Sequence, residues 1–107
     1  MDGEKQRYAM HAAVFAALSN PTRHELMHLL CDCGHTGTEL ADLLGVSRPN
    51  VSQHLAVLQR EGLVVRSREE GRVIWRIVDP RLSQACALID EVLSKQLAGQ
   101  VRALNLT

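Results

Sequence analysis

Residues 37–65 read GTELADLLGVSRPNVSQHLAVLQREGLVV, and this stretch decides the fold. A short amphipathic helix is predicted to end at Gly45, and a second helix is predicted to begin at Ser47, a residue type that caps helix N-termini. The second helix has an apolar side and a side that carries hydrogen-bonding groups. The apolar residues are Val51, Leu55 and Leu58, and the polar ones are Ser47, Arg48, Asn50, Ser52, Gln53 and His54. Two helices joined by a tight turn, the second with a polar side, suit the major groove of double-stranded DNA.

A β-hairpin is predicted directly after the second helix. The β-rich segments 63–67 and 73–78 are separated by an arginine-rich turn that contains glycine. Arg66, Arg68 and Arg72 of this hairpin are expected to reach phosphates or the minor groove, where they fix register rather than read sequence. For Arg66 and Arg68 the alternative is a solvated strand face. A helix-turn-helix followed by such a hairpin is a winged helix-turn-helix.

Two helices are predicted before residue 37. The first helix of the quoted stretch also has a predicted N-cap. The segment 8–18 is alanine-rich and apolar on several sides, so we expect it at a subunit interface. An N-cap and a proline, Asn20-Pro21, begin a helix that runs to about Cys31 and buries leucines. Thr38 is expected to cap the helix over 39–44. The inward residues are expected to be Leu26, Leu29 and Leu30 in one helix and Leu40, Leu43 and Leu44 in the other.

A last helix is predicted from Asp79-Pro80 to about Leu97, with an apolar stripe along one side. The predicted fold is therefore mostly α with a β-hairpin wing, in the order helix, helix, helix, helix, strand, strand, helix. One domain over residues 1–107 accounts for the chain, with flexible segments at 1–7 and 98–107.

Composition narrows the class of protein. The start of the chain lacks the basic and apolar pattern of a signal peptide, and no apolar run is long enough to cross a bilayer, so we expect a cytoplasmic protein without membrane contact. Net charge is zero over the 107 residues, but the arginines gather between positions 46 and 78. That segment contains more basic than acidic residues. The basic ones are Arg48, Arg60, Arg66, Arg68, Arg72 and Arg76, and the acidic ones are Glu61, Glu69 and Glu70. Positive potential is thus expected where the DNA-reading elements lie.

The sequence resembles the ArsR/SmtB family of bacterial transcriptional repressors. The resemblance rests on ALSNPTRHELMHLL at 17–30, TELADLLGVSRPNVSQHLAVLQREGLV at 38–64 and GRVIWRIVDPRL at 71–82. It implies a homodimer joined through its first and last helices, which binds a palindromic DNA operator and releases it when an effector binds. By matching position, it implies DNA contacts from the residues of the polar side, 47–54. Chemistry agrees, because Arg48 can pair with guanine and Asn50 and Gln53 can pair with adenine.

The metal sites of the family are where this sequence departs. The Cys-x-Cys pair of its metal sensors corresponds to Thr36 and Thr38 here. In the last helix only Asp79 matches a family ligand, so we expect that this zinc site is lost. Arg81, Val92 and Lys95 occupy the other approximate ligand positions.

Three cysteines remain as candidate sensors: Cys31, Cys33 and Cys86. As thiolates they could bind a soft metal or metalloid ion such as As(III), Cd(II), Pb(II) or Cu(I). The alternative is redox or reactive-sulfur sensing, in which Cys31 or Cys33 forms a disulfide with Cys86. A third interpretation is that Cys86 is a small core residue. His24 and His28 share a helical face with Cys31, which we interpret as a solvated polar face, and His35 is a further candidate ligand.

The leading hypothesis is a homodimeric DNA-binding repressor that releases its operator on a thiol-directed signal. A winged helix used only for protein–protein contact is a lesser alternative. No nucleophile, base and acid set and no phosphate-binding glycine loop is evident, so we predict that the protein is not an enzyme.

Overall fold

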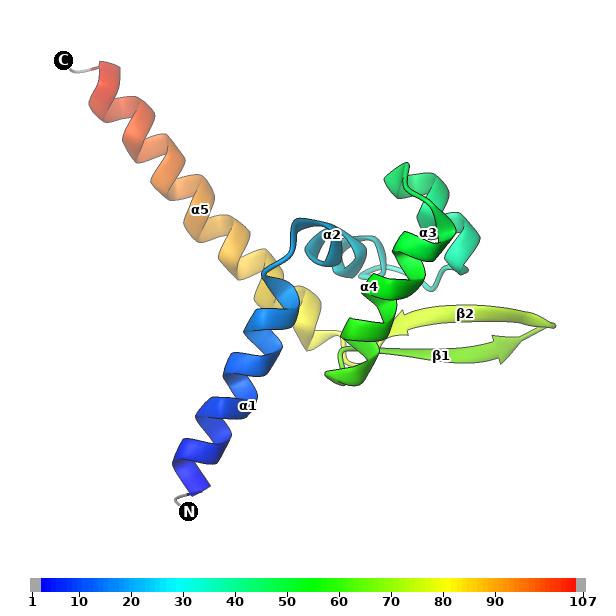
Figure 1. Ribbon diagram of the computed structural model, residues 1–107. Coiled ribbons are helices and arrows are strands. Elements are labelled where there is room, and N and C mark those ends of the chain that lie inside the picture. The colour runs from blue at the N-terminus through cyan, green and yellow to red at the C-terminus, as the bar shows by residue number, and fades with distance from the viewer. Residues whose placement is uncertain (1–2, 106–107) are drawn as a thin grey trace.

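The computed structural model describes residues 3–105, with side-chain burial described for residues 3–99. The elements are α1 (Gly3–Leu18), α2 (Pro21–Leu29), α3 (Gly37–Leu44), α4 (Arg48–Arg60), β1 (Val64–Glu69), β2 (Arg72–Ile77) and α5 (Arg81–Asn105). This order is the predicted one, and the protein is a winged helix-turn-helix (Figure 1). Helices also run over residues 3–7 and 98–105, for which we expected flexibility. The ends of those segments, 1–2 and 106–107, lie outside the described residues.

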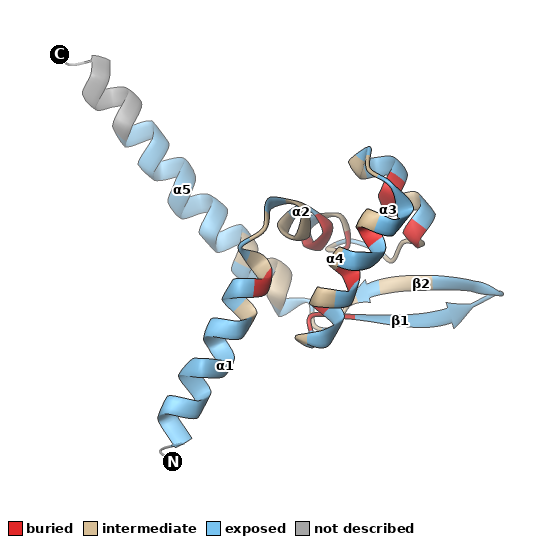
Figure 2. Cartoon of the chain, viewed as in Figure 1, coloured by how far each residue is buried: buried red, intermediate tan, exposed pale blue. Residues whose placement is uncertain are grey.

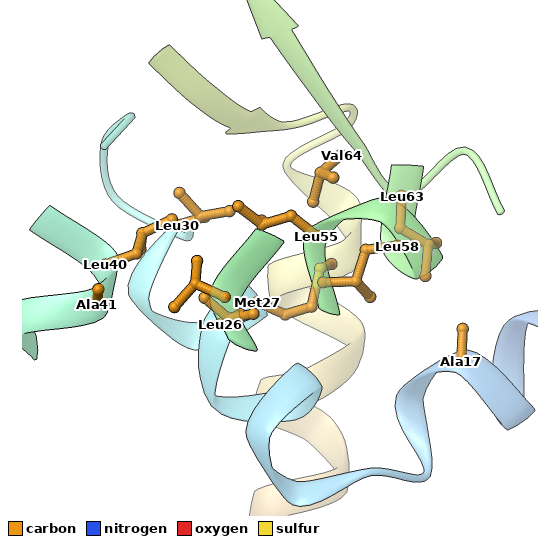
Figure 3. Close-up of a cluster of buried hydrophobic side chains, with 11 residues drawn as sticks. Ala17, Leu26, Met27, Leu30, Leu40, Ala41, Leu55, Leu58, Leu63 and Val64 are labelled. Atoms are coloured by element: carbon orange, nitrogen blue, oxygen red, sulfur yellow. The ribbon is translucent and has the colours of Figure 1, made fainter. Parts of the chain in front are cut away.

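The core lies where α2, α3 and α4 meet the start of β1. Buried side chains come from all of these elements and from the end of α1 (Figures 2 and 3). They are Ala17, Leu26, Met27, Leu30, Leu40, Ala41, Val51, Leu55, Leu58, Leu63 and Val64. Val51, Leu55 and Leu58 are all at most 1% exposed, so this side of α4 faces the core. The opposite side of α4 is open to solvent, as the periodicity predicted.

Two predicted helix caps are confirmed, and one is corrected. Asn20 Oδ1 accepts backbone N–H groups at the start of α2, and the Ser47 hydroxyl accepts the Asn50 N–H at the start of α4. The cap of α3 is Thr36 rather than Thr38, since the Thr36 hydroxyl accepts the Glu39 N–H at 3.1 Å. The earlier start brings Gly37, Leu40, Ala41 and Leu44 to the inner face of α3. Leu43, which we expected to point inward, falls on the flank and is 56% exposed.

The wing is a two-stranded antiparallel hairpin in which Val64 pairs with Ile77 and Glu69 pairs with Arg72. The two-residue turn has positive φ angles at both Glu70 and Gly71, which is the geometry of a type I′ turn. On the other edge of β2, a short bridge joins His35 and Trp75 through two backbone hydrogen bonds of 3.1 and 2.8 Å. The loop between α2 and α3 is therefore attached to the wing.

Helices α1 and α5 leave the core in different directions (Figure 1). Most of their length is exposed, as Figure 2 shows, although large apolar side chains lie along both. These side chains are Tyr8, Met10 and Phe15 on α1 and Leu88, Ile89, Val92, Leu93 and Leu97 on α5. Apolar helix faces of this extent indicate a protein interface.

Candidate DNA interface and thiol pocket

The polar side of α4 lies on the surface of the domain. Ser47, Arg48, Ser52 and Gln53 are exposed, whereas Asn50 and His54 are partly buried. Ser47 also serves as the N-cap, so the backbone N–H groups of the first turn of α4 face the same surface as its hydroxyl. The exposed N-terminus of a helix favours phosphate, and the side chains one turn further are placed for base edges.

Arg48 folds back onto the start of α3. Its guanidinium donates to the Thr38 hydroxyl and lies so close to Gly37 that a Cβ there would come within 3.1 Å of Nη2. This contact joins the first turn of α4 to the start of α3. Arg48 therefore links the two helices as well as contributing charge to their surface.

The three wing arginines differ in their surroundings. The Arg66 guanidinium lies 5.9 Å from the centre of the Trp75 ring on the paired strand, and Arg68 is exposed near the turn. Arg72 donates from Nη2 to Glu39 Oε1 at 2.6 Å, which joins the wing to α3. All three remain exposed, but Arg72 is already paired.

A hollow of about 560 Å³ lies between α3, α4 and the wing. Three of the arginines, Arg48, Arg66 and Arg72, line it together with the exposed hydroxyls of Thr38 and Ser52. Side chains from α4 and from the wing thus meet on one surface, which is basic although Glu39 also lines it and pairs with Arg72. Such a surface is the electrostatic footprint expected of a site for nucleic-acid phosphates.

A second pocket, of about 440 Å³, separates α2 from α5 and holds two of the three thiols. Cys31 and Cys86 both line it, and so do His24, His28 and Asp90. Burial is the main cause that raises the pKa of the Cys86 thiol, and the charges of Asp90 and Cys31 add to it. The sequence placed His24, His28 and Cys31 on one face, and the pocket brings them together, although α2 ends before Cys31.

Cys33 lies apart from that pocket. It is exposed, and its Sγ is 3.5 Å from Nε2 of His35, beside the wing. No group of three or more His, Cys, Asp or Glu residues within the described part of one protomer is arranged to hold a metal ion. A three-thiolate site built from Cys31, Cys33 and Cys86 of a single chain is thus not formed.

At the start of α5, Asp79 is engaged with Arg81. The Arg81 guanidinium and backbone N–H both donate to its carboxylate, which lowers the pKa of Asp79 to about 2. We expected Asp79 to match a family zinc ligand, and in the structure its carboxylate forms an ion pair with Arg81.

Two residues of the site were not singled out by sequence reasoning. Glu39 bonds to both His35 and Arg72, and Trp75 pairs with His35 and lies under Arg66. A partial signal existed for Glu39, because the pattern T-x-x-E at 36–39 is that of a capping box. Nothing in the local pattern indicates Trp75, since its contacts come from segments distant in sequence.

Comparison with known proteins places these features in context. The family model described as "Bacterial regulatory protein, arsR family" matches residues 20–65. The uncharacterized HTH-type transcriptional regulator Rv0081 of Mycobacterium tuberculosis is 31% identical over 99 residues, which cover 92% of this chain and 87% of that one. A probable mercury resistance operon repressor of Streptomyces lividans is 32% identical over 77 residues, covering 72% of this chain and 62% of the repressor.

A solved structure extends the likeness to three dimensions. It is the homodimeric winged helix-turn-helix DNA-binding domain of Mb0332 from Mycobacterium bovis, described as a possible ArsR-family regulator. It superposes with a TM-score of 0.83 at 27% identity, over 91% of this chain and 90% of that domain. Among the described residues, no helix is long and apolar enough to cross a membrane.

Proposed function

Because this chain belongs to the ArsR family of bacterial regulatory proteins, we propose that it is a homodimeric transcriptional repressor controlled by a thiol-directed signal. The family consists of winged-helix transcriptional regulators rather than enzymes. The repressor would bind a palindromic operator and release it when the signal reaches its thiols. A cytoplasmic location follows from the same function.

The basic hollow between α4 and the wing carries the DNA-binding part. Ser47, Ser52 and Gln53 present exposed hydrogen-bonding groups on the helix that would enter the major groove, with Asn50 and His54 beside them. Arg66, Arg68 and Arg72 would contact the backbone next to that groove. The dimeric form is supported by the exposed apolar faces of α1 and α5 and by the homodimeric Mycobacterium bovis domain.

The pocket between α2 and α5 carries the sensing part. Cys31 lies just after the end of α2, which packs on α4, the proposed recognition helix. Cys86 lies on α5, which carries the proposed dimer interface. A covalent or coordinate link between the two sulfur atoms would change how α5 sits on the domain. Since the spacing of the two recognition helices depends on α5, the link would alter operator affinity.

Two chemistries remain for this link. A disulfide needs the two thiols that the pocket supplies and a two-electron oxidant from outside the protein, which takes up the two electrons as both protons leave. A soft ion such as As(III), Cd(II), Pb(II) or Cu(I) prefers thiolates too, but among the described residues of one protomer no group of three ligands is arranged around such an ion. The mercury operon repressor among the relatives favours the metal, and the pairing of two thiols favours the disulfide.

Gel-shift titration of the reduced protein with its own promoter fragment tests the proposal. We expect a shift at moderate salt that oxidant abolishes in the presence of chelator if a disulfide is the signal, and that soft ions abolish if metal is the signal. Cys31→Ser and Cys86→Ser should each remove the response while retaining the shift. The absence of any sequence-specific shift by the reduced protein would refute the DNA-binding function and favour a winged helix used for protein contact alone.

A further inference from the structure

Cys33 is joined to the wing by a continuous chain of polar contacts. Its Sγ lies 3.5 Å from His35 Nε2, His35 Nδ1 lies 2.9 Å from Glu39 Oε2, and Glu39 Oε1 accepts from Arg72 Nη2 at 2.6 Å. Four side chains from the α2–α3 loop, α3 and β2 thus connect an exposed thiol with a predicted DNA-contacting arginine. We propose that Cys33 is a reactive thiol, activated by His35, whose modification by soft electrophiles is transmitted through Glu39 to Arg72.

The orientation of the imidazole follows from its partners. A carboxylate can only accept, so the short contact with Glu39 places a proton on His35 Nδ1. In the neutral ring Nε2 then carries a lone pair, and this atom faces the Cys33 sulfur. Thiol, imidazole and carboxylate are therefore arranged as a nucleophile, a base and the group that orients the base.

A cationic side chain lines the same groove as Cys33. It belongs to Arg76, which also forms an ion pair with Glu69 at 2.9 Å. Cationic neighbours and partial exposure are the conditions under which cysteines react. Cys86 is less exposed than Cys33, and burial first and nearby negative charge second raise the pKa of its thiol.

The loop that holds the pair is rigidly placed. Backbone hydrogen bonds tie His35 to Trp75 in both directions, and Gly34 lies so close to β2 that a Cβ would approach Ile74 Cγ2 to 2.5 Å. His35 is consequently fixed relative to the wing, and the imidazole does not depend on a mobile loop for its position.

Iodoacetamide serves as the probe electrophile for the Cys33 thiol. With iodoacetamide, the sulfur forms a bond to the methylene carbon, iodide leaves with the electron pair of the broken carbon–iodine bond, and the thiol proton passes to His35 Nε2 and from there to water. The new group occupies the space between sulfur and ring, which displaces His35 from Glu39. Before modification Glu39 is shared between His35 and Arg72, and afterwards Arg72 of β2 is left as its partner. This step rests on the DNA-binding function proposed above: Glu39 then holds Arg72 more firmly and withholds it from phosphate.

Residue-resolved alkylation of the full chain, without DNA, tests the first step. The rate of iodoacetamide addition at each cysteine is measured by mass spectrometry in the native protein and in His35→Gln, with His28→Gln as the matched control beside Cys31. We expect Cys33 to react fastest and His35→Gln to slow it on the order of tenfold, while the control leaves it unchanged. Equal rates in native protein and His35→Gln, with both variants folded by circular dichroism, would overturn the activation.

Operator binding tests the second step separately. In a Cys31→Ser/Cys86→Ser background, alkylation of Cys33 should weaken binding and reduce the dependence of log K on log salt by about one unit, the effect of one lost phosphate contact. Glu39→Gln should abolish this response. If alkylated and unmodified protein bind with the same salt dependence, the transmission is wrong, even when binding itself confirms the repressor.

Discussion

Gly34 is the residue on which the placement of the α2–α3 loop depends. Its α-carbon faces the wing, and an added Cβ would lie 2.5 Å from Ile74 Cγ2 and 2.9 Å from Arg76 Cζ. Ile74 is β-branched and has little freedom to move away. The glycine is thus required by close approach and not by an unusual φ angle.

Gly34→Ala should lower the free energy of unfolding by about 1–3 kcal/mol, because the methyl group must displace a packed strand residue. Urea denaturation followed by circular dichroism measures the change. Gly3→Ala is the matched control, since a Cβ at Gly3 meets nothing within 4 Å. Equal destabilisation by both substitutions would contradict the close packing of the loop.

Asp79 provides a prediction about pH. Its pKa is lowered from an ordinary value of 3.8 to about 2, first by the Arg81 guanidinium and then by the Arg81 N–H. A lowered folded-state pKa means that the carboxylate contributes stability above pH about 4 and that this contribution is lost as pH falls through about 2. Carboxyl-resolved NMR titration should give a midpoint near 2 for Asp79, and Arg81→Ala should return it towards 3.8. A midpoint unaffected by Arg81→Ala would assign the shift to another cause.

At the scale of elements, α4 and the wing are expected to play different roles on DNA. Gln53 is exposed on the polar side of α4, and Arg68 is exposed on β1. The first suits base edges and the second suits phosphates.

Gln53→Ala should cost about 1–3 kcal/mol on the operator and relax preference at one base pair, whereas Arg68→Ala should weaken binding to every sequence and reduce the salt slope by about one unit. Fluorescence anisotropy on the operator and on a scrambled duplex, at several salt concentrations, separates the two. The assignment fails if Arg68→Ala changes base preference or if Gln53→Ala weakens both duplexes equally.

The sequence predicted the elements well because local rules govern them. Capping residues and apolar periodicity mark α2 and α4, and glycine in a short turn marks the hairpin. Boundaries shifted where two local rules competed: Thr36 and Thr38 are both suitable caps, and packing of Leu40 and Ala41 selects Thr36.

The polar contacts of the site were less predictable. The neighbourhood of Cys33, His35 and Glu39 depends on the bridge between His35 and Trp75, which joins segments forty residues apart in the chain. No local pattern encodes that bridge. For the same reason, sequence left open whether Cys31 or Cys33 lies near Cys86, and the packing of α5 on α2 brings Cys31 there.

At the scale of the whole molecule, the chain spreads over 59 × 44 × 22 Å because α1 and α5 extend beyond the core. Apolar side chains on α5 such as Leu93, 50% exposed, gain a dry environment only from a partner subunit. The proposed dimer explains this shape.

Leu93→Asp should therefore convert the protein largely to monomer and weaken operator binding by at least about tenfold, since a buried unpaired carboxylate is costly. Sedimentation velocity reports the oligomeric state. Val65→Asp is the control, because Val65 is similarly exposed, at 47%, but lies on the wing. A dimer that survives Leu93→Asp and dissociates with Val65→Asp would place the interface elsewhere.

The exposed apolar length of α1 and α5 also bears on how long a chain survives in the cell. An unpaired subunit offers these helices to proteases and chaperones, which act on accessible apolar segments, whereas pairing conceals them. Degradation of each subunit would then be fastest at low protein concentration, where few subunits are paired. The level of the protein would therefore rise more than proportionally with its rate of synthesis. The same two helices would thus make abundance, as well as assembly, depend on concentration.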